Sequence, residues 1–392
     1  MRILHISPYF PSLEANHAGG QCMGKELETL RKRHQVYVLT FIASDYDRTL
    51  WERCRDRAYT RGVSVGRFRR IFHAALAPWM PNYFAVRTSL RFSLLLIYMV
   101  RKYKIDVIHA EYASMGQYAW IKKMFPHLRF HLVEHDVTVQ SYERQKENSR
   151  GWKRLYLECQ RRLIEREERE YCQRADTLFA FNEKDRRLLA SHYGIKKCLV
   201  INPYYGLDDE MLQGDADWSE EKENTICFLG QMGRPENHLA AMELIRIASK
   251  VKERVPGLQV YIVGNKPSEE LRRQENEWIH VTGFVEDVDI YLREAKLAVF
   301  PLRQGAGIKL KVLRSLALGT PVITSAVGAE GIDESGSVIR LAETEMEYEE
   351  QIVSWLKKED ERQHLGQESR KYVREHFGWK MSEEVLGRVY TN

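Results

Sequence analysis

The chain has 392 residues, of which 44% are hydrophobic and 29% are charged. This length exceeds one ordinary α/β sheet and suits two domains of fewer than about 200 residues each. The composition is that of a globular enzyme and argues against a disordered chain. The longest apolar run, residues 94–100, is too short to span a bilayer, so we expect no integral membrane protein.

The net charge of +5 is distributed unevenly along the chain. Residues 1–200 hold 36 Lys and Arg against 21 Asp and Glu, whereas the remainder holds 24 against 34. Two interpretations stay open. The halves present solvated surfaces of opposite sign, or the first half faces an anionic partner such as phospholipid headgroups or a pyrophosphate-linked acceptor. We expect no nucleic-acid partner.

The first residues form an apolar strand pattern without the features of a secretory signal. The six cysteines form no C-x-x-C pair, so we expect no zinc site and a reducing, cytoplasmic location. Peripheral association with the inner face of a membrane is a further expectation. Four cysteines in or beside predicted elements are expected to be buried or inert thiols: Cys159, Cys172, Cys198 and Cys227.

Strand-like apolar runs alternate with helix-length amphipathic segments, a rhythm typical of βαβ units and parallel sheets. In the first half the predicted strands are residues 2–7, 35–41, 63–68, 106–111, 130–134, 176–181 and 198–202. The longest predicted helix lies around residues 142–174 and is densely charged. Residues 79–100 fit either a buried amphipathic helix or a helix on a membrane surface.

Residues 204–224 are polar and acidic, which predicts a linker between domains. The rhythm then restarts, with predicted strands at residues 225–230, 259–264, 280–284, 297–302, 322–325 and 338–341. We therefore expect two doubly wound parallel sheets facing across a cleft, with ligands at the carboxyl ends of the strands.

Two glycines, Gly305 and Gly307, precede a helix predicted to begin at about Ile308. Backbone N–H groups beside glycines and at a helix N-terminus favour an anion. Lys309 and Lys311 fall in the first helical turn, where acidic residues are normally preferred. This pattern indicates a diphosphate site, and a purely structural glycine loop is the alternative.

This stretch resembles the donor-site signature of glycosyltransferase family 4. The matching residues are Gly305, Gly307, Lys309, Lys311, Ala317, Gly319, Pro321 and Val322. Further resemblances to the family follow in its usual order at residues 1–20, 106–112, 133–136, 182–189, 227–237, 281–287 and 374–386. Together they cover nearly the whole chain.

The resemblance implies a GT-B fold of two Rossmann-like domains. Residues 1–205 with 376–392 would form the N-terminal, acceptor-side domain, and residues 206–375 the domain that binds the nucleotide-sugar donor. It implies a retaining glycosyltransferase that moves a sugar to a glycan or lipid-linked acceptor, in cell-surface polysaccharide or glycoconjugate synthesis. No cofactor and no metal are implied.

The resemblance also implies the site residues. His135 would be the catalytic residue and act near the donor sugar, with a core or capping histidine as the alternative. The base would stack near Phe284 and bond to the backbone around Val285, and the glycine loop at Gly19 and Gly20 would let the backbone approach the substrates. The full donor-binding set is Gly19, Gly20, Gly230, Arg234, Phe284, Val285, Gly305, Gly307, Ile308, Lys309, Lys311 and Arg314.

Both glutamate positions of the family pattern are changed in this chain. Where the family has a glutamate that holds the donor ribose, this chain has Arg314, and the family's other glutamate falls on Ala306. Arginine has five donors and no acceptor, so in an active enzyme we expect Arg314 to contact the nucleoside end with a different polarity. The alternative is a catalytically inactive GT-B subunit that binds a partner glycosyltransferase or a glycan. In that case Arg314 would pair with a neighbouring acid and close the pocket.

Three D-x-D triplets, at residues 45–47, 215–217 and 287–289, lie in loops or at a helix start and are interpreted as chance. His127, His131 and His135 are spaced by four, but a strand would spread them too far apart to share a metal ion.

Overall fold

The computed structural model describes residues 1–54, 58–65, 81–209 and 223–391. Their contacts divide the chain into two compact units. Unit 1 comprises Met1–Gly206 with Lys380–Asn392, and unit 2 comprises Leu207–Trp379. Of the expected linker at residues 204–224, positions 210–222 lie outside the described residues.

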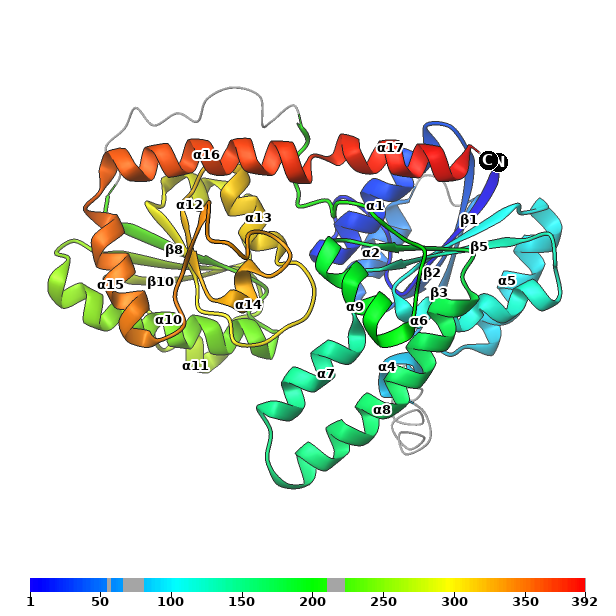
Figure 1. Cartoon of the computed structure of the whole chain (residues 1–392), viewed down its shortest axis with the longest axis horizontal. Coiled ribbons are helices and arrows are strands. Elements are labelled where there is room, and N and C mark those ends of the chain that lie inside the picture. The colour runs from blue at the N-terminus through cyan, green and yellow to red at the C-terminus, as the bar shows by residue number, and fades with distance from the viewer. Residues whose placement is uncertain (55–57, 66–80, 210–222, 392) are drawn as a thin grey trace. The chain divides into compact units, whose positions relative to one another are not determined.

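Unit 1 is built on a seven-stranded parallel sheet in the order β3-β2-β1-β4-β5-β6-β7 (Figure 1). The strands are β1 (Arg2–Ser7), β2 (Gln35–Ile42), β3 (Thr60–Ser64), β4 (Val107–Glu111), β5 (Arg129–Glu134), β6 (Thr177–Ala180) and β7 (Cys198–Val200). The strands predicted for the first half are confirmed, except that β3 begins earlier than residue 63 and that residues 66–68 are not described.

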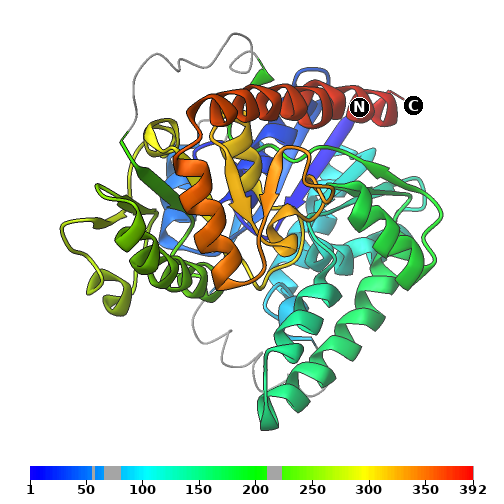
Figure 2. The same cartoon turned by 60° about the vertical axis from the view of Figure 1, so that its left-hand side comes forward.

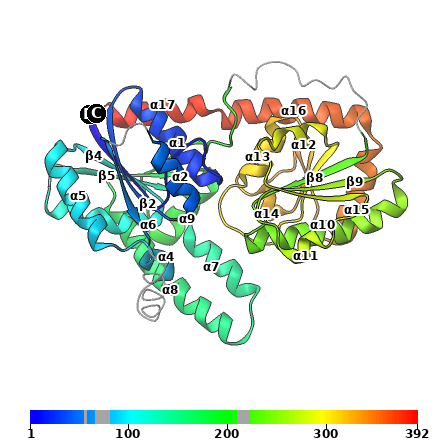
Figure 3. The same cartoon turned by 180° about the vertical axis from the view of Figure 1, so that it is seen from behind.

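Helices cover both faces of this sheet, and one of the two faces is apolar. Helices α5 (Leu90–Tyr103), α6 (Ala113–Gly116) and α8 (Gly151–Arg174) cover an apolar face. There the Phe92 ring stacks on the Phe41 ring with centroids 4.5 Å apart. Helices α1 (Ala18–Arg31) and α17 (Trp379–Tyr390) cover the opposite face (Figure 3).

The prediction of a single long helix around residues 142–174 is wrong. Two helices, α7 (Thr138–Glu147) and α8, form a hairpin that turns at residues 148–150, and Gly151, with a φ of +57°, begins α8. A left-handed φ suits glycine and cannot be part of a continuous right-handed helix through this position. The buried Glu168 carboxylate on α8 accepts the backbone N–H groups of Thr138 and Val139, at 2.8 and 3.3 Å, so α8 caps the start of α7.

Unit 2 contains a six-stranded parallel sheet in the order β10-β9-β8-β11-β12-β13. The strands are β8 (Thr225–Leu229), β9 (Gln259–Val263), β10 (Ile279–Gly283), β11 (Leu297–Phe300), β12 (Val322–Thr324) and β13 (Ile339–Leu341). All six strands predicted for the second half are thus confirmed, as is the expectation of two parallel, Rossmann-like sheets. In each unit the strand order reverses beside the first strand, between β1 and β4 and between β8 and β11. Doubly wound sheets bind ligands at the carboxyl ends of strands at such a point.

Helices complete both units. In unit 2 they are α10 (Pro235–Arg254), α11 (Glu269–Arg272), α12 (Asp289–Glu294), α13 (Leu310–Ala317), α14 (Ala326–Ala329), α15 (Glu345–Leu356) and α16 (Glu359–Phe377). In unit 1 the remaining ones are α2 (Asp45–Arg53), α4 (Asn82–Ala85), α9 (Glu183–Tyr193) and the 3-10 helix η1 (Gln117–Lys123). Within the described part of the chain, none of the helices combines the length and hydropathy that a membrane crossing requires.

Candidate active site

The loops that follow β8 and β9 in unit 2 come close to one another without room for side chains. A Cβ atom on Gly264 would lie 1.7 Å from the Gly230 carbonyl oxygen, and one on Gly230 would lie 3.0 Å from the Asn237 side chain. Gly305 and Gly307 have φ of +112° and +67°, a region that favours glycine. The predicted glycines therefore shape the backbone at the carboxyl edge of the sheet.

Lys309 caps the helix that follows this loop. Helix α13 begins at Leu310, so the expectation that it begins at Ile308 is two residues early. The Lys309 ammonium donates to the Gly307 carbonyl oxygen at 2.6 Å and to the Ala306 carbonyl oxygen at 3.3 Å. The lysine thus curls over its own glycine loop.

Lys311 lies in the first turn of α13 and donates to the Asn237 amide oxygen at 2.6 Å. Its ammonium lies among protein atoms, 4.8 Å from the centre of the Phe228 ring, although part of the side chain reaches solvent. This burial, reinforced by the charges of Lys309 and Arg234, lowers the pKa of Lys311 to about 7. Three cationic side chains therefore act on one another beside a glycine loop and a helix N-terminus, and an added anion would relieve their repulsion.

An aromatic ring is exposed at the end of β10. Phe284 is 67% exposed and follows Gly283, whose φ is +71°. Val285, the next residue, is partly buried. An exposed ring on a glycine-shaped turn offers a flat apolar surface of the kind on which a nucleobase stacks.

Arg314, on α13, forms an ion pair with Asp289, the first residue of α12. The Arg314 Nε atom lies 2.6 Å from the Asp289 Oδ1 atom, and the Asp289 backbone N–H donates to Asp287 at 2.8 Å. The D-x-D triplet at residues 287–289, interpreted as chance, therefore has a structural role. The triplet at residues 45–47 has one as well, because Asp47 forms a capping box with Ser44 on α2. The triplet at residues 215–217 lies outside the described residues.

In unit 1, His135 lies just past the end of β5 and is 8% exposed. Its Nε2 atom is 2.8 Å from the Glu111 Oε2 atom, so the imidazole edge bonds to a buried carboxylate. The Tyr112 ring stacks on the His135 ring, with centroids 3.6 Å apart and planes at 12°. Tyr112 has a φ of +70°, so strained backbone holds the stacking ring in place.

The two glycines of the first unit do not form a loop, contrary to expectation. Gly19 and Gly20 lie in the first turn of α1. A Cβ atom on Gly19 would lie 1.8 Å from the Tyr112 hydroxyl oxygen, and one on Gly20 would lie 2.4 Å from the Ala15 Cβ atom. Within unit 1, these glycines make room for neighbouring side chains.

Glu111 is the centre of a buried polar network beneath His135. His5 on β1 pairs in register with His109 on β4, and both Nε2 atoms approach the Glu111 Oε1 atom, at 3.0 and 3.1 Å. Desolvation alone would raise the pKa of Glu111, but the bonds to His109, His135 and His5 hold it well below its usual range. His109 also contacts Glu26 of α1 at 3.1 Å, and burial with the nearby Glu111 charge raises the pKa of Glu26 to about 7.

The C-terminal helix takes part in the same network. The Tyr390 hydroxyl lies 2.5 Å from the His109 Nδ1 atom. His131 on β5 continues the histidine row next to His109, and its ring meets the edge of the Tyr390 ring. Burial and the charge of His109 lower the pKa of His131 to about 3, so this imidazole is neutral.

Two overlapping groups in this network have the composition of a metal site. They are His5, His109 and Glu111, and Glu26, Glu111 and His135, with ligand atoms within 4.8 Å of one another. Hydrogen bonds between imidazole and carboxylate account for the short distances, and the His5 Nδ1 atom lacks the outer partner that metal-bound histidines usually have. We infer no metal from these groups.

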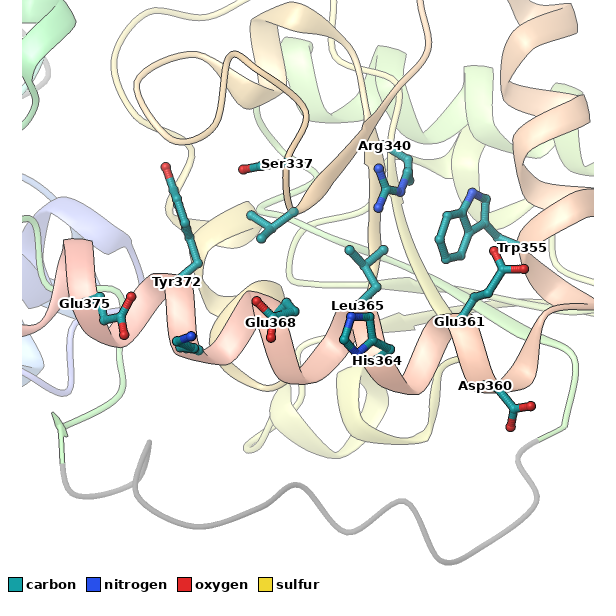
Figure 4. Close-up of a pocket in the computed structure, with 12 residues that line it drawn as sticks. Ser337, Arg340, Trp355, Asp360, Glu361, His364, Leu365, Glu368, Tyr372 and Glu375 are labelled. Carbon is teal, nitrogen blue, oxygen red and sulfur yellow. The ribbon is translucent and has the colours of Figure 1, made fainter.

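A separate hollow of about 680 Å³ lies along α16 on unit 2 (Figure 4). Arg340, Glu368 and Tyr372 are among its lining residues, and the Arg340 guanidinium lies over the Trp355 ring at 4.8 Å. None of the predicted donor residues lines it, so we assign it no substrate.

Reasoning from the sequence missed four residues of the site: Glu111, Tyr112, Asn237 and Asp289. Glu111 ends a predicted strand and Tyr112 follows it, and a polar residue at a strand's carboxyl end is a signal that could have found them. Asn237 and Asp289 contact lysine and arginine from other loops, and no local spacing indicates such contacts.

Models of two protein families match this chain. The family described as Glycosyltransferase Family 4 matches residues 25–206, and that described as Glycosyl transferases group 1 matches residues 223–358. The two matches together span most of the chain. The chain belongs to the GT4-like glycosyltransferases. No curated protein matches this glycosyltransferase.

Solved structures of low sequence identity share the fold of this glycosyltransferase. Sucrose-phosphate synthase from Thermosynechococcus elongatus is 17% identical with a TM-score of 0.70, and the match covers 100% of this chain and 98% of that one. HepE from Anabaena, in complex with UDP, is 13% identical with a TM-score of 0.71 and full coverage of both chains. A variant of TarM from S. aureus, in complex with Fondaparinux, alpha-GlcNAc-glycerol and UDP, is 11% identical with a TM-score of 0.70, again over 100% of both chains. The expected GT-B fold is thereby confirmed.

Proposed function

We propose that the protein is a retaining glycosyltransferase that transfers a sugar from a nucleotide-sugar donor to a glycan or lipid-linked acceptor. The observation that carries this proposal is the gathering of positive charge at the start of α13, where Lys309 bonds to the glycine loop and both Lys309 and Arg234 act on the charge of Lys311. The solved relatives in complex with UDP support a nucleoside diphosphate as the leaving group. Cell-surface polysaccharide or glycoconjugate synthesis in the cytoplasm is the setting we propose.

In this proposal unit 2 binds the nucleotide. The diphosphate rests on the N–H groups around Ile308 with Lys309 and Lys311, the base stacks on Phe284 near the backbone of Val285, and Arg314 contacts the nucleoside end. Prearranged cations and N–H groups stabilise the negative charge that develops on the leaving diphosphate, so no metal or cofactor is required. Activity and nucleotide binding should both survive treatment with EDTA.

His135 is the residue of unit 1 that we propose acts on the transferred sugar. Glu111 and Tyr112 are positioning residues, because one accepts from the imidazole edge and the other stacks on its face. A buried carboxylate bonded to Nε2 fixes how the ring is turned and which nitrogen is left to bond elsewhere.

A screen of nucleotide-sugars by calorimetry, followed by transfer assays with those that bind, tests the proposal. Binding of a nucleoside diphosphate with donor hydrolysis or transfer supports it. The absence of both for every common donor would reject it.

A second candidate function is a non-catalytic GT-B subunit that binds a partner glycosyltransferase or a glycan. The Arg314–Asp289 ion pair favours it, because an inactive subunit was expected to pair this arginine with a neighbouring acid. A partner enzyme whose activity depends on this chain, in the absence of any nucleotide binding, would distinguish it from the first.

A further inference from the structure

The tip of the α7–α8 hairpin carries an apolar stripe that faces solvent. Trp152 is 87% exposed, Leu155 is 59% exposed and Tyr156 is 45% exposed. Their spacing of three and four residues places them on one face of α8. Leu157 and Gln160 on the other face are buried against unit 1. A helix normally turns its large apolar side chains toward the core. The Tyr156 hydroxyl accepts a hydrogen bond from the Asn82 side chain, which accounts in part for the position of this ring, so Trp152 and Leu155 are the residues whose exposure is unusual.

The side chain of a cysteine extends the stripe by one turn. Cys159 is exposed, although its place in a helical pattern predicted a buried or inert thiol. A shallow groove along this part of α8 is lined by Trp152 and Leu155 together with Arg154 and Arg162.

Basic residues flank the apolar stripe. Arg150, Lys153 and Arg154 are exposed, and in the described ranges of the chain no carboxylate forms a salt bridge with them. Glu158, the nearest acid along α8, is already engaged by three other basic side chains. Glu147 at the end of α7 is an exposed acid near these three basic residues, so the tip combines a net positive charge with a tryptophan, a leucine and a tyrosine.

We propose that the hairpin tip docks on an anionic lipid bilayer, with Trp152 and Leu155 in the interfacial layer and Arg150, Lys153 and Arg154 facing lipid phosphates. Tryptophan favours the membrane interface, and basic residues near an anionic leaflet strengthen binding. Figures 1 and 2 both show the α7–α8 tip standing away from the sheet of unit 1, as a surface contact requires. The inference rests on the proposed function, since a lipid-linked acceptor is presented at such a surface.

Charge favours this occupant over a second copy of the chain. A symmetric contact would place the same basic tip against itself, which opposes association. The inference also locates the membrane contact away from residues 79–100, where the sequence suggested it. Helix α5 does expose Leu90 and Leu94, at 75% and 58%, and these residues therefore serve as the control.

Co-sedimentation with vesicles tests the proposal. The full chain and two double variants, Trp152→Glu with Leu155→Glu and Leu90→Glu with Leu94→Glu, are compared on phosphatidylcholine vesicles with and without phosphatidylglycerol. We expect the unmodified chain to require phosphatidylglycerol, the hairpin variant to bind about tenfold or more weakly, and the α5 variant to bind normally. Replacing Arg150, Lys153 and Arg154 with Gln should also weaken binding and reduce its sensitivity to salt, because each basic residue contributes about fivefold.

Several results would overturn the docking inference: no vesicle binding, equal binding to neutral vesicles, or loss of binding in the α5 variant alone. Sedimentation equilibrium that shows a dimer abolished by the hairpin substitutions would assign the stripe to a second copy instead. Calorimetry with UDP, run on the same variants without vesicles, separates the two proposals. If the unmodified chain binds UDP but not vesicles, only the membrane contact is rejected. If the unmodified chain does not bind UDP, the proposed function is rejected.

Discussion

Arg314 and Asp289 form an ion pair at the carboxyl edge of the unit 2 sheet, with the Arg314 Nε atom 2.6 Å from the Asp289 Oδ1 atom. Their side chains are only 20% and 10% exposed, so the pair is largely shielded from solvent. An arginine side chain donates hydrogen bonds and cannot accept them. A ribose hydroxyl bound at Arg314 must therefore accept the hydrogen bond through its oxygen. We predict that Arg314→Ala raises the apparent dissociation constant of the donor more than it lowers turnover.

A matched control for this substitution is Arg303→Ala. Arg303 also forms an ion pair in unit 2, with its Nε atom 2.9 Å from the Glu243 carboxylate, but it is more exposed. Equilibrium binding and steady-state kinetics of both variants give the comparison. A double-mutant cycle with Asp289→Asn should show a coupling of about 0.5–3 kcal/mol in stability. Full activity with unchanged donor affinity in Arg314→Ala would remove this residue from the site.

The diphosphate assignment depends on Lys309 and Lys311. Replacing both with Ala should weaken nucleoside diphosphate binding by about 1.5–3 kcal/mol for each well-placed charge-assisted contact. Calorimetry with UDP measures the loss, and circular dichroism verifies the fold. Lys250→Ala, which removes a lysine paired with Glu345 on the surface of the same unit, is the control. Unchanged UDP affinity in the double variant would place the phosphates elsewhere.

Nucleotide binding should also depend on pH through Lys311. Burial lowers the pKa of this lysine from its ordinary 10.5 to about 7, so above pH 7 the free protein holds it increasingly neutral. A bound diphosphate favours the charged form, and binding must then take up a proton. Affinity should fall with rising pH above about 7, by up to about tenfold for each pH unit. Calorimetry at pH 8 in two buffers of different ionisation enthalpy should detect proton uptake, and Lys311→Gln should abolish it.

The sequence predicted the fold well because both sheets are buried on two faces. A buried parallel strand is a short, almost continuous apolar run bounded by polar residues, and each of the predicted runs corresponds to a strand in the structure. The α7–α8 hairpin was missed for the opposite reason. The segment Lys146–Gly151 is polar on both sides of the turn, so helical periodicity passes through it, and the carboxylate that caps α7 comes from Glu168, far along the chain.

The site was predictable only where its residues are neighbours in sequence. Gly305, Gly307 and the two lysines belong to one loop, and their pattern is visible without a structure. The contact between Arg314 and Asp289 and that between Lys311 and Asn237 join different loops, so neither partner could be assigned beforehand. The network around Glu111 likewise arises from strand register.

His135 is predicted to act on the sugar rather than on the nucleotide. His135→Ala should lower turnover and leave nucleoside diphosphate affinity nearly unchanged. Glu111→Gln should also lower turnover and change the pH profile of kcat, because a neutral amide replaces the carboxylate to which His135 is hydrogen-bonded. The exposed His127 is the control, and its replacement by Ala should have no effect. Lost nucleotide affinity with normal turnover in His135→Ala would show that the role is misassigned.

The contact between Gly19 and Tyr112 gives a stability prediction with its own rescue. Alanine normally stabilises a helix relative to glycine by up to about 1 kcal/mol, yet at Gly19 the new methyl group would lie 1.8 Å from the Tyr112 hydroxyl oxygen. Tyr112 cannot move away freely, since its ring stacks on His135. Gly19→Ala should therefore destabilise unit 1 by about 1–3 kcal/mol, measured by thermal unfolding. Tyr112→Phe removes the clashing oxygen, so the double variant should recover most of the loss. If Gly19→Ala is as stable as the unmodified chain, or if Tyr112→Phe gives no recovery, then this close approach is not what requires glycine at that position.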